Sequence, residues 1–252
     1  MKKRTLIIFL TITLLLLLNS IAFGESEISA LGKRIVISDT NDTSGYVTGI
    51  KIMILLTILS FAPAILLTMT CFTRIIIVLH FIRTALGTQQ TPPNKVLIGL
   101  ALFLTFFIMS PVITDINDNA VKPYMDNEIT EDEAMEKAID PIRDYMLNYT
   151  RDKDLALFID IANIETVNNI DDIPIRALIP AYIISELKTA FQIGFLIFIP
   201  FLVIDMVVAS TLMSMGMMML PPVMISLPFK ILLFVMVDGW NIIIKSLILG
   251  FK

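Results

Sequence analysis

The chain has 252 residues, of which 56% are hydrophobic and 17% are charged, and its mean hydropathy is +0.82. A soluble globular protein carries about 25% charged residues, so this composition indicates a membrane-associated chain. A single cysteine, Cys71, and a single histidine, His80, argue against a disulfide framework, a Cys/His zinc site and a Ser-His-Asp triad. We therefore expect no metal, no cofactor and no catalytic residues.

The N-terminus has the three marks of a secretory signal peptide. Basic residues precede a short apolar stretch from Leu6 to Leu18. The small residues Ala22 and Gly24 then occupy the −3 and −1 positions of a cleavage site after Gly24. We predict that residues 1–24 are a signal peptide and that residues 25–47 form a polar extracytoplasmic segment. The alternative is an uncleaved first transmembrane helix, which the shortness of the apolar stretch disfavours.

Two uncharged runs, residues 52–73 and 96–114, are each long enough to cross about 30 Å of hydrocarbon as a helix. The connection between them contains basic residues but no acidic residue, and the positive-inside rule places it in the cytoplasm. We predict a first helical hairpin over residues 48–114, with a basic connection at residues 74–95.

An acidic segment follows, residues 115–176, with a local net charge of −10. Helical spacings over residues 131–142 and 145–162 predict amphipathic helices, and Pro141 and Pro174 predict breaks. By the same topological argument, this helical insert lies outside the cytoplasm.

Residues 177–252 are predicted to form a C-terminal helical hairpin with a methionine-rich turn over residues 216–222. Hydrocarbon does not tolerate orphaned backbone groups, so helices that contain prolines must meet where protein or water satisfies those groups. This pattern favours a gate or a pathway over a plain anchor. The predicted fold class is all-α: membrane-associated helical hairpins with kinked long helices and a small helical insert.

Methionines crowd the predicted turn. The candidate gate residues are Met213, Met215, Gly216, Met217, Met218, Met219, Pro221 and Pro222. Thioether side chains are flexible and apolar, so a ring of them can close on itself and deform around a passing chain. The residues alone leave open the alternative that these methionines pack against lipid or core.

Isolated charges interrupt the C-terminal apolar stretches. They are Glu186, Lys188, Asp205, Lys230, Asp238 and Lys245. A charge in hydrocarbon is costly unless it is paired or hydrated, so three acids and three bases predict ion pairs within or between subunits. Asp238 and Lys245 are seven residues apart and are expected to share a helix face. Arg74 is a further candidate for pairing, and a proton relay is the functional alternative.

Several separate motifs, in order along the chain, resemble one known family. They are CFTRIIIVL at residues 71–79, GTQQTPPN at 87–94, SELKTAFQIGF at 185–195, LPFK at 227–230 and VDGW at 237–240. Together they resemble the FliP family of type III secretion export gates over roughly residues 48–250. The signal peptide and the acidic insert resemble the flagellar branch of that family. The virulence-injectisome branch is the alternative.

The resemblance implies a non-enzymatic, channel-forming subunit of the flagellar protein export gate in the bacterial inner membrane. In such assemblies a pentamer of FliP-like subunits joins FliQ-like and FliR-like subunits in a right-handed helical cone, above FlhB-like and FlhA-like components. The cargo is unfolded secreted protein, and no nucleic acid is involved. The resemblance also implies that Met217, Met218 and Met219 form a gasket at the narrowest point of the channel. Hydropathy alone, in contrast, gives a four-span protein.

Two other functions remain as alternatives. Asp205 and Asp238 could form an intramembrane aspartyl protease pair, but the Gly-x-Gly-Asp pattern is absent around both residues. A secondary transporter would also use proline-broken helices and midplane charges, but it would normally have repeated halves, and the sequence has none.

Overall fold

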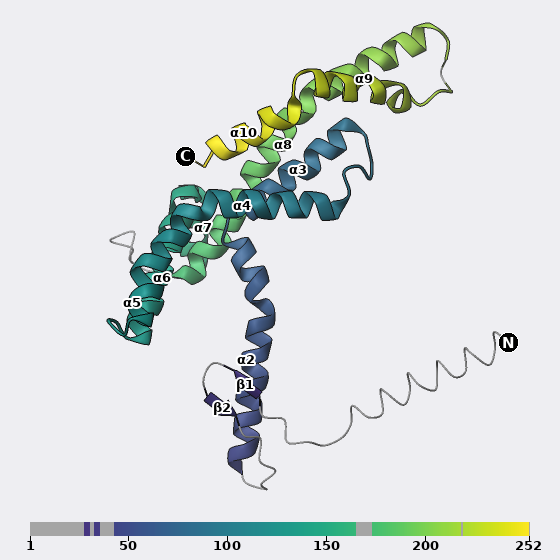
Figure 1. The fold of residues 1–252 in the computed structure, drawn as a ribbon. Coiled ribbons are helices and arrows are strands. Elements are labelled where there is room, and N and C mark those ends of the chain that lie inside the picture. Colours follow the sequence, from purple (N-terminus) through teal and green to yellow (C-terminus); the bar gives the residue numbers. More distant parts are fainter. Residues whose placement is uncertain (1–27, 31–32, 36–42, 165–172, 218, 252) are drawn as a thin grey trace, which may run out of the picture. The chain divides into compact units, whose positions relative to one another are not determined.

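A computed structural model describes residues 28–30, 33–35, 43–164, 173–217 and 219–251 (Figure 1). The predicted signal peptide, residues 1–24, lies outside these described residues, as does Met218. The chain divides into two compact units, Met1–Phe61 and Ala62–Lys252, which are described separately.

The first unit contains a short ribbon and the start of a long helix. Strands β1 (Ile28–Ala30) and β2 (Lys33–Ile35) pair antiparallel, and Ile28 lies opposite Ile35. Helix α2 (Thr43–Thr68) begins within the segment predicted to be polar and continues through the boundary of the unit. The helix therefore starts nine residues before the uncharged run and ends five residues before that run does.

The second unit is helical throughout its described residues. Its elements are α3 (Phe72–Leu86), α4 (Asn94–Ile116), the π-helical segment η2 (Asn117–Val121), α5 (Lys122–Met125), α6 (Glu131–Tyr149), α7 (Asp152–Ile161), α8 (Ile175–Ser214), α9 (Pro222–Met236) and α10 (Gly239–Leu249). β1 and β2 are the only strands in the described part of the chain. The predicted all-α fold class is confirmed.

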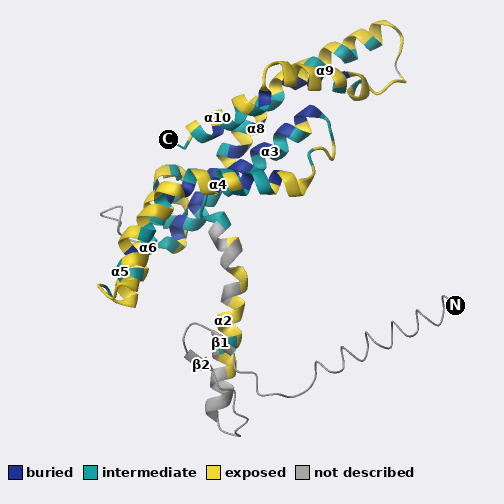
Figure 2. Ribbon diagram, viewed as in Figure 1, coloured by how far each residue is buried: buried dark blue, intermediate teal, exposed yellow. Residues whose placement is uncertain are grey.

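Helix α3 is the centre of the core. Ile75, Val78, Leu79 and Ile82 recur at helical spacing and are fully buried, because α3 packs against α8 on one side and α4 on another (Figure 2). Most of the segment predicted as a basic connection is thus a core helix. Only residues 87–93 form a loop, which begins where Gly87 adopts a left-handed conformation and ends α3.

The insert contains one prediction that is wrong. A break was expected at Pro141, but α6 runs through it to Tyr149. A proline inside a helix costs about 3 kcal/mol, and here the loss is offset because Tyr145 and Met146 of the same helix are buried in the core. The break predicted at Pro174 is confirmed, since this residue is the N-cap of α8.

Two helical stretches in the described residues are long and apolar enough to cross a membrane, Asn94–Met125 and Ile175–Ser214. Helices α9 and α10 form a third if they act as one span, although they are bent by 62° at the break between them. The four spans that hydropathy predicts include residues 52–73, several of whose side chains are not described. At 1.5 Å per residue, α8 is about 60 Å long, roughly twice the thickness of the hydrocarbon.

Candidate functional site

The methionine turn, residues 215–221, joins α8 to α9. Helix α8 ends at Ser214, and Gly216 follows with φ of 75°, a conformation that glycine adopts without strain. Pro221 is the N-cap of α9 and Pro222 is its first residue, where proline lacks only an N–H that would have no partner anyway. Glycine thus ends one helix and proline starts the next, so the sequence itself places the turn.

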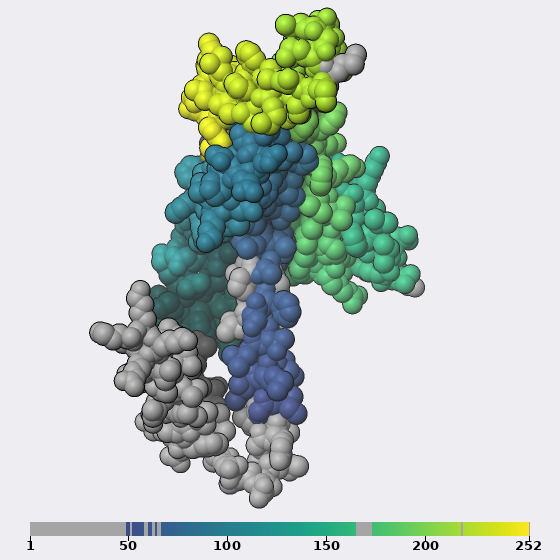
Figure 3. All heavy atoms as spheres, turned by 90° about the vertical axis from the view of Figure 1, so that its right-hand side faces the viewer, coloured from purple at the N-terminus to yellow at the C-terminus, as the bar shows by residue number. Residues whose placement is uncertain are grey.

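The described methionines of this turn and its flank have little cover within their own chain. The exposed fractions are 61% for Met213, 71% for Met215, 40% for Met217 and 98% for Met219. Figure 3 shows the tip of the α8–α9 hairpin standing out from the rest of the unit. An apolar tip of this kind marks a surface that something else covers.

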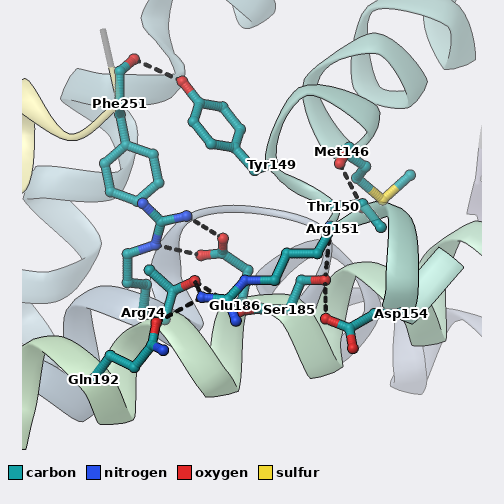
Figure 4. A network of polar contacts seen from close by, with 11 residues as sticks. Arg74, Met146, Tyr149, Thr150, Arg151, Asp154, Ser185, Glu186, Gln192 and Phe251 are labelled. Atoms are coloured by element: carbon teal, nitrogen blue, oxygen red, sulfur yellow. Dashed lines mark hydrogen bonds and ion pairs between the residues drawn. The ribbon is translucent and has the colours of Figure 1, made fainter.

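A buried ion pair joins α3 to α8. Arg74 Nε donates to Glu186 Oε2 at 2.9 Å, and Arg74 Nη2 donates to Glu186 Oε1 (Figure 4). Glu186 is completely buried and Arg74 almost so, which makes this a bidentate pair in a water-poor setting. The guanidinium also lies over the rings of Phe251 and Tyr149, at 4.0 and 5.4 Å from their centroids.

The start of α7 is held by Ser185, the residue before Glu186 on α8. Ser185 Oγ accepts a hydrogen bond from the Arg151 N–H at 3.0 Å and donates one to Asp154 Oδ2 at 2.8 Å. Arg151 Nη2 donates to Gln192 Oε1 at 2.6 Å (Figure 4). The ion pair and these contacts form a polar junction of Arg74, Arg151, Asp154, Ser185, Glu186 and Gln192. Sequence reasoning missed its role in docking the insert, although the helical spacing of residues 185 and 192 in the SELKTAFQ motif is a signal for it.

Two buried groups lie beside this junction. Burial raises the pKa of the Tyr145 hydroxyl, and Cys71 is a fully buried free thiol that packs as a small apolar group. Within the described ranges, no group of three or more His, Cys, Asp or Glu side chains is placed to hold a metal ion.

A second ion pair joins α9 to α8. Lys230 Nζ donates to Asp205 Oδ2 at 2.6 Å and to the carbonyl oxygen of Ala85 at 3.2 Å, near the C-terminus of α3, where a cation is favoured. Ser226 Oγ donates to the other carboxylate oxygen of Asp205. Both oxygens of Asp205 are therefore engaged in a link between three helices, which does not fit an aspartyl protease pair with Asp238.

The remaining predicted charges stay apart. Lys188, Asp238 and Lys245 are exposed, and none of them forms an ion pair with another described residue. The prediction that Asp238 and Lys245 share a helix face is wrong. The chain bends after α9, and Asp238 adopts a left-handed conformation (φ 51°) at the N-cap of α10, where its side chain makes no capping hydrogen bond.

These features define a class: a predominantly helical protein with helices long and apolar enough to cross a membrane, linked to one another by ion pairs. Comparison with known proteins gives the family. The FliP family model matches residues 55–247, and the chain belongs to the FliP family. The resemblance found in the motifs is thus confirmed.

Relatives of the chain occur in several bacteria. The flagellar biosynthetic protein FliP of Bacillus subtilis (strain 168) is 62% identical over 221 residues, which are 88% of this chain and 100% of that protein. The protein of the same name from Pectobacterium carotovorum subsp. carotovorum is 53% identical, over 84% of this chain and 82% of its own length. That of Aquifex aeolicus (strain VF5) is 50% identical, over 82% and 87%.

Proposed function

We propose that this protein is a structural, channel-forming subunit of the flagellar type III protein export gate, with no catalytic role of its own. The relatives named above are all called flagellar biosynthetic proteins, which supports the flagellar branch over an injectisome. The subunit would be needed for secretion of flagellar proteins and hence for flagellum assembly, and its cargo would be unfolded protein chains.

The observation that carries this proposal is the exposed methionine turn. In a ring of identical subunits, Met217, Met218 and Met219 of each copy would lie at one level and form a gasket, and Met213, Met215, Gly216, Pro221 and Pro222 would support it. Hydrophobic constrictions close by excluding water, so no charged group is needed to block ions. Flexible thioethers would then part around an extended polypeptide and close behind it.

The rest of the hairpin supports assembly. Beyond the methionine turn, α8 and α9 expose large apolar side chains, among them Phe195, Leu196, Met206 and Met236. The length of α8 exceeds what hydrocarbon alone can cover, so neighbouring subunits are the natural cover for the remainder. We propose a homopentamer that joins FliQ-like and FliR-like subunits in a right-handed cone, above FlhB-like and FlhA-like components.

The charges divide between two roles in this proposal. Arg74 with Glu186, and Lys230 with Asp205, hold the single subunit together. Lys188, Asp238 and Lys245 have no ion-pair partner in the described chain and would pair across subunit contacts. The subunit would lie in the bacterial inner membrane, within the flagellar basal body. Residues 1–24 would be removed, and both the mature N-terminus and the insert at residues 115–176 would be extracytoplasmic.

Ion conductance tests the gasket. We expect that replacing Met217, Met218 and Met219 together by Ala makes the assembled gate leak small ions while secretion persists, because a wider ring no longer dewets. Met135→Ala, which removes an exposed methionine of the insert, far from the turn in sequence, is the matched control and leaves conductance unchanged. A triple variant that conducts no more than the parent protein would refute the gasket.

Native mass spectrometry tests the assembly. The solubilised protein is measured alone and after coexpression with FliQ-like and FliR-like proteins from the same source. A five-copy ring that takes up unequal numbers of the two partners is the expected result. A stable monomer or dimer that ignores both partners would instead favour the secondary transporter.

A further inference from the structure

Helix α10 presents two different faces. Trp240, Ile243 and Leu247 recur at helical spacing and pack into the same core cluster as α3. Beside that face lies an open hollow of ≈ 550 Å³, which α10 lines together with Phe107 of α4. The α10 residues that line it are Asn241, Ile244, Lys245, Ile248 and Leu249. Because the core face fixes α10 in place, the hollow does not depend on any movement of the helix.

The hollow combines an apolar wall with a single cation. Among the described residues that line it, Lys245 is the only charged one, and Asn241 is the only other polar one. Phe107 is 66% exposed within a helix that is apolar and long enough to cross a membrane. Small-molecule sites have a similar character, with mostly apolar walls, few polar groups and a volume of about 300–1,000 Å³. The hollow therefore has the size and the lining of a site for an amphipathic ligand.

Lys245 has no counter-charge within the described part of its own chain. It forms no ion pair there, and the side chain of Asn241, one turn earlier, forms no hydrogen bond with these residues. Helices α9 and α10 together are a candidate span, and Lys245 lies four residues before the end of α10. At 1.5 Å per residue this is about 6 Å from the helix end, where a lysine side chain reaches the lipid headgroups.

We propose that the hollow binds one anionic phospholipid, whose acyl chain packs along Phe107, Ile244 and Ile248 and whose phosphate pairs with Lys245. Charge complementarity identifies the headgroup, because an unpaired ammonium group attracts anionic lipids, whereas a zwitterionic headgroup has no net charge. The apolar wall identifies the rest of the ligand, since a free phosphate ion would leave these three side chains uncovered. The Asn241 amide is available to donate a hydrogen bond to the same headgroup.

The lipid would have a role in the single subunit. It would cover the apolar wall between α4 and α10, and it would give Lys245 a counter-charge before any neighbouring subunit is present. This inference therefore does not rest on the export-gate function.

Lipid titration of the solubilised full chain, followed by native mass spectrometry, tests the site. The probes are phosphatidylglycerol and phosphatidylcholine with identical acyl chains, and bound lipid is counted per subunit on the lowest-mass species present. We expect the parent protein to bind phosphatidylglycerol about fivefold more tightly than phosphatidylcholine. In Lys245→Gln this preference should disappear, because phosphatidylglycerol binding weakens about fivefold and phosphatidylcholine binding is unchanged. Lys188→Gln removes an exposed, unpaired cation of α8 away from the hollow and is the matched control, which should keep the preference.

A second pair of variants tests the apolar wall. Ile244→Trp places a larger side chain in the hollow and should weaken binding of both lipids at least about fivefold. Ile242→Trp is its control: Ile242 is 54% exposed on the same helix and does not line the hollow, so this variant should bind both lipids as the parent does. Inorganic phosphate should not displace phosphatidylglycerol from the parent protein, because it makes no contact with the apolar wall.

Three outcomes would overturn the proposal. Equal binding of the two lipids, or binding of neither, would show that Lys245 selects no anionic headgroup. Equal loss in Lys245→Gln and Lys188→Gln would show only a general attraction of anionic lipid to a positively charged surface. Displacement of the lipid by inorganic phosphate would show that the acyl chain and the hollow contribute nothing.

Discussion

The second half of α8 is the more apolar in sequence, with one charged residue against three in the first half, and yet it is the half with less cover from its own chain. The first half, up to Gly194, buries eight residues against α3, α6 and α7, including Ser185 and Glu186 of the polar junction. The second half buries only Phe201 within its own chain, although it contains a long uncharged run. Apolar composition therefore shows that a helix must be covered, and it does not show by what.

The difference separates folding from assembly. The first half is covered within one subunit, because Ser185, Glu186 and Gln192 have partners and its apolar face has a core. The second half ends in the exposed methionine turn and presents its apolar side chains outward. Changes in the first half should therefore cost stability of the single chain, whereas changes near the turn should leave that stability intact.

The largest expected effect comes from breaking the buried ion pair. Glu186→Ala should destabilise the solubilised protein by about 3–5 kcal/mol, because it leaves the Arg74 guanidinium buried without its carboxylate. Denaturant unfolding followed by circular dichroism measures this loss. Lys188→Ala, two residues along and exposed, is the control and should change stability by no more than about 0.5 kcal/mol. If both variants lost the same unfolding free energy, the buried Glu186 would contribute no more to stability than the exposed Lys188, and the prediction would be wrong.

A smaller effect is expected where the two halves meet. Gly194→Ala would place a methyl group 2.4 Å from atoms of the Phe81 ring, which itself packs edge-on against Phe191. The ring must shift, and overpacking of this kind costs about 1–3 kcal/mol. The same unfolding experiment measures it.

Gly99→Ala in α4 is the matched control for that substitution, since nothing lies within 4 Å of the added Cβ. Alanine is the better helix former, so this variant should be stabilised by up to about 1 kcal/mol. If Gly194→Ala is also stabilised, α3 and α8 do not approach as closely as the structure shows.

The smallest effect is expected at the methionine turn. Met219→Ala should leave the unfolding free energy within about 0.5 kcal/mol of the parent, because its side chain is 98% exposed. Met146→Ala, which truncates a fully buried methionine in α6, is the contrasting control and should cost about 2–5 kcal/mol. A cost above about 1 kcal/mol for Met219→Ala would show that the turn packs on its own subunit, and the comparison between the two regions would fail.

Local features of the sequence were sufficient for much of the fold. Gly216, Pro221 and Pro222 mark the turn between α8 and α9, because each of them restricts or permits backbone conformations at its own position and needs no distant partner to do so. Pro174 marks the start of α8 for the same reason. Family membership was also readable, since the motifs at residues 71–79, 87–94 and 185–195 occur in order.

Features that depend on a distant partner were not readable. Residues 74–95 were predicted to be a connection because their basic side chains suggested a cytoplasmic loop. Arg74 is instead buried in helix α3, in an ion pair with Glu186, which lies 112 residues further along the chain. Pro141 was taken for a helix end because its local cost is large, yet burial of Met146 holds α6 together. Neither partner can be identified from the local pattern.

By itself, the sequence determined that the chain is helical and membrane-associated, where its main hairpin turns, and which family it belongs to. These properties follow from composition, from glycine and proline at fixed positions, and from ordered motifs. Only the tertiary structure decided that Glu186 belongs to Arg74, that Lys230 belongs to Asp205 and the end of α3, and that Phe251 closes onto the polar junction. The physical reason is that an ion pair or a ring contact depends on distance in space, and a linear pattern of charges is compatible with many such pairings.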